Sequence, residues 1–140
     1  MEVIFVIIVL GILAAIALPK FASSKKLADI SKGHADVATI RSAIVSERQT
    51  QLIKGINTFI PKLSDNSDIL FTGDGTRVLL MYGIKAQTDT GWAASGTGYK
   101  DYTYTVDGVS VPFVYTDGDG RFTCDVTNTT SGELCKQLIY

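Results

Sequence analysis

The chain begins with a continuous apolar segment, and its hydrophobic pattern then changes. Every residue in segment 3–18 is apolar or glycine, so this segment has no polar face. In segment 27–44, apolar residues recur at steps of three and four, which is typical of an amphipathic helix. Gly55 is a suitable stop signal for that helix. The sequence therefore predicts one long helix over residues 3–54, apolar on all sides at first and on one side afterwards.

Two residues make the first part of this helix irregular. Pro19 has no backbone N–H and its ring clashes with the preceding turn, which predicts a kink or a locally melted stretch. Gly11 lowers the helix propensity of the apolar part. The change of pattern also requires two surroundings: lipid or other helices for the first part, and a sheet on one side of the second part.

The clearest β signal lies in the last third of the chain. Segments 102–106 and 109–115 alternate polar and apolar residues, and they flank Asp107-Gly108, a two-residue hairpin turn. Pro112 predicts that the second segment is an edge strand or carries a bulge.

Three further segments complete the expected head. Segment 121–126 is expected to be a strand, segment 135–140 a last strand, and segment 78–82 a strand or a buried run. Trp92 lies in an expected loop, where it either caps the core or binds a ligand. The resulting fold class is α+β, a long N-terminal helix packed on a small antiparallel sheet of three to four strands.

The chain has two cysteines, Cys124 and Cys135, and one histidine, His34. The histidine is too far upstream to complete a metal site with the cysteines. A loop-closing disulfide is the simpler interpretation, with a stabilisation of about 3 kcal/mol, and two reduced buried thiols are the alternative. A disulfide requires an oxidising compartment such as a periplasm or the cell exterior. His34 is expected to be partly buried, or to form a pH-sensitive assembly contact.

The formal net charge of −1 conceals an asymmetry along the chain. Residues 20–62 carry eight Lys or Arg and three Asp or Glu, whereas residues 63–140 carry five and ten. With a net charge of −1, the chain gives no sign of the positive surface that binds nucleic acids. The two parts are either solvated surfaces of different sign, or surfaces that attract the opposite part of a neighbouring copy.

The sequence offers no catalytic constellation of nucleophile, base and ligand cluster, so we expect no enzyme and no cofactor. Asp117 and Asp119 resemble the start of a calcium loop, but the twelfth position is Asn128 rather than glutamate. They are weak metal candidates, and no metal site is expected. Asn128 also begins a glycosylation sequon by pattern, and we expect it to be unmodified.

The apolar segment has three interpretations. As a helix, segment 3–18 spans about 24 Å, somewhat less than the hydrocarbon core of about 30 Å, which permits a transmembrane anchor. The motif Ala15-Ile16-Ala17 has the form of a cleavage site, which permits an export signal. Glu2 opposes the signal, because the head of a signal peptide should be basic. The third interpretation is the stem of a subunit that packs helix against helix in a polymer.

Four lysines follow the apolar segment: Lys20, Lys25, Lys26 and Lys32. By the positive-inside rule they place the body of the protein in the cytoplasm, which contradicts the disulfide. A basic leader before Met1 removes the conflict. A carboxylate at the edge of an apolar helix costs several kcal/mol unless it is paired or stays in the interface. Glu2 therefore either lies among headgroups at the helix start, where the dipole favours it, or pairs with a positive group of another chain.

The segment "EVIFVIIVLGILAAIALPKF" resembles the N-terminal segment of type IV pilins and of the related pseudopilins of type II secretion. Glu2, Gly11 and Pro19 stand at the spacing of that family. The resemblance implies a leader that a prepilin peptidase cleaves before N-methylation, and it implies that Glu2 neutralises the terminal amine of an adjacent subunit. It also implies an exposed C-terminal loop closed by the two cysteines. Family members usually place Phe and three further residues before the Glu, whereas Met1 alone precedes it here.

The expected protein is thus a structural subunit of a type IV pilus-like filament, for attachment, motility or DNA uptake. Residues 1–21 form the transmembrane or filament-core stem, residues 22–54 the amphipathic half of the helix, and residues 55–140 the head. Expected partners are further copies, minor subunits and an inner-membrane assembly machine; the location is the bacterial inner membrane, then a surface filament. The alternatives are a pseudopilin in a periplasmic pseudopilus, and a soluble periplasmic binding module whose mature form starts near Leu18.

Overall fold

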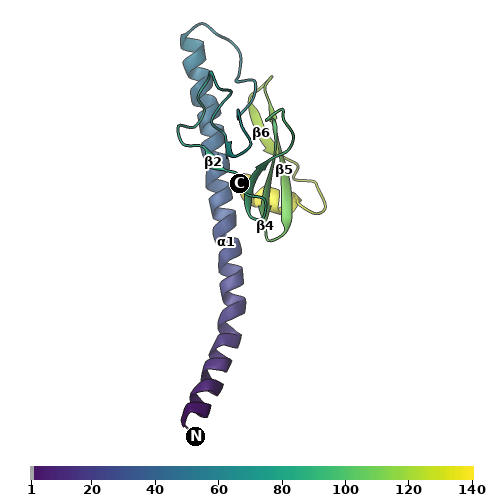
Figure 1. Cartoon of the computed structure of the whole chain (residues 1–140). Helices are drawn as coiled ribbons and strands as arrows, with labels where there is room; N and C mark the ends of the chain where they lie inside the picture. The colour runs from purple at the N-terminus through teal and green to yellow at the C-terminus, as the bar shows by residue number, and fades with distance from the viewer. Residues whose placement is uncertain (1) are drawn as a thin grey trace.

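The computed structural model describes residues 2–140, and its largest element is the helix α1, Glu2–Ile53. Its 52 residues correspond to a length of about 78 Å. The helix continues without interruption through Pro19, so the expectation of a locally melted stretch is wrong, and its N-terminal part curves away from the line of the rest (Figure 1). The long helix that the sequence predicts is confirmed.

The head contains two antiparallel sheets and a second helix beside α1 (Figure 1). The four-stranded sheet has the order β3-β4-β5-β6, with β3 at Gly91–Ala94, β4 at Asp101–Val106, β5 at Val109–Thr116 and β6 at Arg121–Cys124. The small sheet pairs β1, Ile69–Leu70, with β2, Ile84–Lys85. The helix α2, Gly132–Ile139, follows the last strand. The expected α+β class is confirmed.

The β4–β5 hairpin turns at the two residues that the sequence identifies. Val106 pairs with Val109, and the intervening Asp107 and Gly108 have φ values of 53° and 76°. Positive φ at both central residues is the type I′ geometry, whose twist matches that of the flanking strands.

The expectation for Pro112 is wrong, because β5 is an inner strand with neighbours on both sides. The N–H of Tyr115 donates to Lys100 on the β4 side, so the two-residue period turns the nitrogen of Pro112 towards β6. The ladder with β6 ends at Phe113, which pairs with Cys124. The proline therefore stands one residue beyond that ladder, where no donor is required.

Two further expectations about the head are wrong. Segment 135–140 belongs mostly to α2 rather than to a strand, since Cys135 and Leu138 are buried three residues apart on one helix face. Segment 78–82 is neither a strand nor a buried run; its contribution to pairing is an isolated bridge from Val78 to Gly73. Met81 is 83% exposed in that segment.

The core lies between one face of the four-stranded sheet and the two helices. Alternate residues of the sheet are buried, and the opposite face is exposed. On α1, burial recurs at steps of four and three from Gly33 to Gln51. The largest buried side chains of the sheet are aromatic: Trp92, Tyr102, Tyr104, Phe113, Tyr115 and Phe122. Trp92 is thus a core residue of β3, which decides between the two expectations for it.

Gly33 is the residue that allows this close packing. A Cβ at position 33 would lie 2.6 Å from Cδ2 of Leu138 and closer still to the ring of Tyr104. The hydroxyl of Tyr104 donates to the main-chain oxygen of Asp29, one turn below, at 2.7 Å. The absence of a side chain at Gly33 therefore brings α1, α2 and the sheet together.

We expect Gly33→Ala to lower the free energy of unfolding of the head by about 1–3 kcal/mol through overpacking. The gain in helix propensity, about 1 kcal/mol, offsets only part of this cost. Chemical denaturation followed by tryptophan fluorescence measures the effect. Gly11→Ala is the matched control, because a Cβ there meets nothing within 4 Å; equal stability of the two variants would contradict the packing argument.

Candidate functional site

The N-terminal part of α1, residues 2–21, is called the stem here, and its apolar side chains are uncovered in the single chain. Every residue from Glu2 to Ala28 is exposed, and the first buried residue of α1 is Gly33. The exposed large apolar residues of the stem are Val3, Ile4, Phe5, Val6, Ile7, Ile8, Val9, Leu10, Ile12, Leu13, Ile16, Leu18 and Phe21. Figure 1 shows this part extending away from the head.

Such a surface requires an apolar environment. Burial of one large aliphatic side chain contributes about 1.5–3 kcal/mol, so burial of the stem is worth on the order of 20 kcal/mol. An 18-residue window of α1 has a mean hydropathy of 2.7 and none of it is buried. The stem is about 30 Å long, the thickness of a bilayer's hydrocarbon core. By length and composition, this helix can cross a membrane.

The three stem residues singled out from the sequence lie on this uncovered helix. Glu2 is exposed in the first turn of α1, Gly11 lies in the middle of the stem, and Pro19 lies near its end. They are spread along the stem and do not converge on one point of the head.

Just beyond the stem, a small electrostatic contact connects α1 to the head. Nζ of Lys26 lies 3.3 Å from Oδ2 of Asp107, at the tip of the β4–β5 hairpin. Both side chains are about half exposed or more, so this ion pair is worth at most about 1 kcal/mol. The contact marks the lower end of the head on α1.

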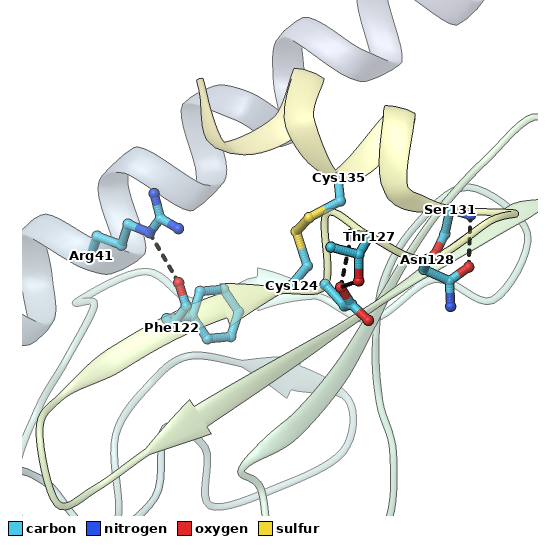
Figure 2. The surroundings of a disulfide bond; sticks show 8 residues. Arg41, Phe122, Cys124, Thr127, Asn128, Ser131 and Cys135 are labelled. Carbon is cyan, nitrogen blue, oxygen red and sulfur yellow. Dashed lines mark hydrogen bonds between the residues drawn. A yellow bond between two sulfur atoms is a disulfide. The ribbon is translucent and has the colours of Figure 1, made fainter.

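The disulfide between Cys124 and Cys135 is present, as the sequence predicts, with 6.0 Å between the two Cα atoms. It connects the end of β6 to the middle of α2 (Figure 2). The turn before α2 is held by Asn128, whose Oδ1 accepts hydrogen bonds from the N–H groups of Thr130 and Ser131 at 2.9 and 3.1 Å. The loop between the cysteines is therefore ordered, because the disulfide and the hydrogen bonds of Asn128 hold it.

Arg41 connects α1 to the outer edge of the sheet beside the disulfide. Its Nε donates to the main-chain oxygen of Phe122 in β6 at 3.0 Å (Figure 2). That oxygen faces away from β5, at the edge where a further strand would otherwise pair. Arg41 thus satisfies a main-chain acceptor at this edge, a contact that the sequence did not indicate.

The two candidate metal ligands are each engaged with a separate cation. Oδ2 of Asp117 lies 2.8 Å from Nζ of Lys100, and this hydrogen bond lowers the pKa of Asp117 below its ordinary value. Oδ2 of Asp119 lies 3.3 Å from Nε of Arg121. Among residues 2–140, no three His, Cys, Asp or Glu side chains gather in a way that holds a metal ion.

The expectation of a partly buried His34 is wrong, since the residue is exposed. It borders a shallow surface depression with residues of α1 and α2, among them Ile30 and Gln137. The apolar stripe of α1 passes through Gly33 and Val37 instead, which turns position 34 outwards.

Sequence reasoning missed a polar contact in the core. Nε1 of Trp92 donates to Oδ2 of Asp36 at 3.1 Å. Burial raises the pKa of Asp36, while this hydrogen bond and the charge of Lys32 act in the opposite direction. Asp36 lies well outside the stem, in the part of α1 that packs on the head.

We therefore expect Asp36→Asn to gain stability relative to the wild type as the pH rises. The raised folded-state pKa means that the wild type loses stability from the unfolded-state value of about 3.8 up to the folded-state value. Asparagine keeps an acceptor for Trp92 and does not ionise. Free energies of unfolding of both proteins from pH 3 to pH 7 measure this, and a difference that does not change with pH would contradict it.

A second missed contact fastens the loop after β1 to α1. Nε of Arg77 lies 3.8 Å from Oε1 of Glu47, whose side chain is 4% exposed. Arg77 also donates to the main-chain oxygen of Thr58 at 3.2 Å and to its Oγ1 at 3.0 Å. Within the described chain, neither carboxylate oxygen of Glu47 accepts a hydrogen bond, so loss of Arg77 would leave a buried charge unpaired.

The fold and the exposed stem define the class of this protein: an α+β head on a long helix whose apolar end can cross a membrane, with a disulfide closing the C-terminal part. No protein-family model, curated protein or solved structure matches the chain.

Proposed function

We propose that the protein is the structural subunit of a type IV pilus-like filament, which polymerises through the stem of α1. The observation that carries this proposal is the contrast between the stem and the head. The head has a complete aromatic core of its own, whereas thirteen large apolar side chains of the stem are exposed. A stem of this kind bundles with stems of other copies and leaves the heads on the outside.

The sequence around the stem supports the same proposal. Glu2 directly precedes segment 3–18, which has no charged residue, and a carboxylate in this place requires a positive partner once the stem is buried. The terminal amine of a neighbouring subunit supplies this partner in the proposed filament. The resemblance of the stem to type IV pilins and pseudopilins rests on Glu2, Gly11 and Pro19.

The proposed life cycle has two locations. The subunit first lies in the bacterial inner membrane with the stem in the bilayer, and an assembly machine then transfers it to the filament. The disulfide supports a head on the oxidising side of that membrane. The filament serves attachment, motility or DNA uptake.

Assembly of the purified full-length chain tests the proposal. We expect filaments, seen by electron microscopy and in the pellet after high-speed sedimentation, when detergent is removed. Leu10→Asp places a charge in the stem and should abolish the polymer while the head keeps its near-ultraviolet circular dichroism. Val114→Asp is the matched control, because Val114 is 47% exposed on the outer face of the sheet. A wild-type chain that stays monomeric, or polymer that Leu10→Asp does not reduce, would overturn the proposal.

A further inference from the structure

Two aspartates share an open groove on the head that the proposed function does not explain. The groove has a volume of about 600 Å³, and Asp68 and Asp89 lie in its wall with Thr90. Two main-chain hydrogen bonds fix its sides: Ala86 donates to the oxygen of Asp68, and Gln87 donates to the oxygen of Trp92, both at 2.8 Å. The backbone on the two sides of the groove is therefore ordered.

Four acidic groups of the head are matched by a cation, and these two carboxylates are among those that are not. The four matched groups are Asp107, Asp117, Asp119 and Glu133, each within 4.0 Å of a Lys or Arg nitrogen. In the part of the chain that the structure describes, neither Asp68 nor Asp89 has such a partner. Lys85, the cation nearest to Asp89 in sequence, is exposed on β2 and also forms no ion pair in the described chain.

Two lysines, one at the end of the stem and one just beyond it, are unmatched in the same way. Lys20 and Lys25 are exposed, and over residues 2–140 neither lies within 4.0 Å of a carboxylate oxygen. Lys26, by contrast, is paired with Asp107. In the described chain, the two aspartates of the groove and these two lysines thus belong to the unmatched charges of the head and of α1.

The two aspartates of the groove and the two lysines of α1 lie at a similar level along α1. Thr90 lines the acidic groove, and it also lines the depression that contains Lys25 at the base of the head. Lys20 lies five residues further down the helix, about 7.5 Å along its axis. A second copy that is parallel to the first and shifted along this axis brings its own lysines to the groove.

We propose that the groove of Asp68 and Asp89 is a docking site for the Lys20–Lys25 segment of a second copy of this chain. This inference rests on the proposed function and adds a specific contact to it. The groove is acidic, and the segment that reaches it in a parallel neighbour is basic. Charge complementarity within one sequence therefore identifies the partner as another copy.

The contact has a physical role that the stem does not perform. Segment 3–18 of the stem is apolar on every side, so its contacts with other stems change little when one helix slides along another. Ion pairs at a fixed place on the head favour one axial position over the others. The docking site sets the register of the subunits, and burial of the stem supplies the larger part of the attraction.

Charge reversal in the full-length chain tests the contact. The groove variant carries Asp68→Lys and Asp89→Lys, and the helix variant carries Lys20→Asp and Lys25→Asp. We expect each to raise the critical concentration for assembly about tenfold, which corresponds to about 1.4 kcal/mol per subunit, and we expect an equimolar mixture or the fourfold variant to restore assembly. The control carries Asp101→Lys and Lys54→Asp, two exposed residues outside the site, and should assemble as the wild type does.

The outcomes distinguish this contact from the proposed function. Wild-type chain that stays monomeric overturns both. Wild-type chain that polymerises, while either reversed variant polymerises equally well or the fourfold variant fails to recover, overturns the contact alone. Salt gives a second readout, because screening weakens exposed ion pairs. When the salt concentration is raised roughly tenfold, from about 0.05 M to about 0.5 M, the critical concentration of the wild type should rise. That of the fourfold variant should rise in the same way.

Discussion

Glu2→Gln leaves the head folded and prevents polymerisation. The substitution keeps the size of the side chain and removes its charge, so in the proposed filament the terminal amine of the neighbouring subunit would be buried without a partner. An unpaired charge in such surroundings costs several kcal/mol for each subunit added. A loss of about 3 kcal/mol per subunit raises the critical concentration more than a hundredfold. Sedimentation and electron microscopy after detergent removal measure the effect.

Two observations separate this effect from a general loss of structure. The near-ultraviolet circular dichroism of Glu2→Gln should equal that of the wild type, because Glu2 is exposed and far from the buried part of α1. Glu2→Asp, which keeps the charge, should assemble better than Glu2→Gln. Normal filaments from Glu2→Gln would exclude the pairing of this carboxylate with an amine.

Cys124→Ser lowers the free energy of unfolding of the head by about 3 kcal/mol. The disulfide closes a short loop, with a sequence separation of 11, and the entropy of closing a loop of this size corresponds to that value. We expect the midpoint of thermal unfolding to fall by on the order of 10 °C. Segment 125–140 should exchange amide hydrogens faster, whereas the buried part of α1 keeps its protection.

The design of this experiment includes two controls. Cys135→Ser removes the same bond from the other side and should give the same midpoint. The wild type in reducing buffer should approach both variants, whereas reductant should leave the variants unchanged. An unchanged midpoint for Cys124→Ser in non-reducing buffer would argue against a stabilising role of the disulfide.

Features that depend on neighbouring residues were predictable from the sequence. The long helix follows from the apolar segment and the stripe after it, and the hairpin follows from Asp107-Gly108. The bond between Cys124 and Cys135 involves the only two cysteines of the chain. The stem, which is the basis of the proposed function, is also a property of one continuous segment.

Features that depend on distant residues were not predictable in this way. Pro112 is tolerated in an inner strand because the pairing with β6 ends at Phe113, one residue away. The length of β6 cannot be inferred from the residues around Pro112. Segment 135–140 is too short for its apolar positions to distinguish a strand from the last turns of a helix. His34 is exposed because Gly33 takes the buried position beside it, where Tyr104 and Leu138 approach.

Phe71 shows the same limit for backbone conformation. Its φ is 62°, in the left-handed region, yet its side chain is completely buried. The ring packs on three others, with centroids 4.5 Å from Tyr102, 5.3 Å from Trp92 and 5.8 Å from Phe122. Burial of the ring offsets a conformational cost of about 1–3 kcal/mol. No local sequence signal indicates that Phe71 adopts a positive φ in order to bury its ring.

The account is tested most directly by the intact mass and N-terminal peptide of the native protein, purified from sheared surface material and from membranes. The account predicts that the sheared fraction contains the chain with its stem intact and with a methylated residue shortly before Met1. The same terminus in membranes alone would favour a pseudopilus. A mature chain that starts near Leu18 would mean that the apolar segment is an export signal, and it would contradict the filament.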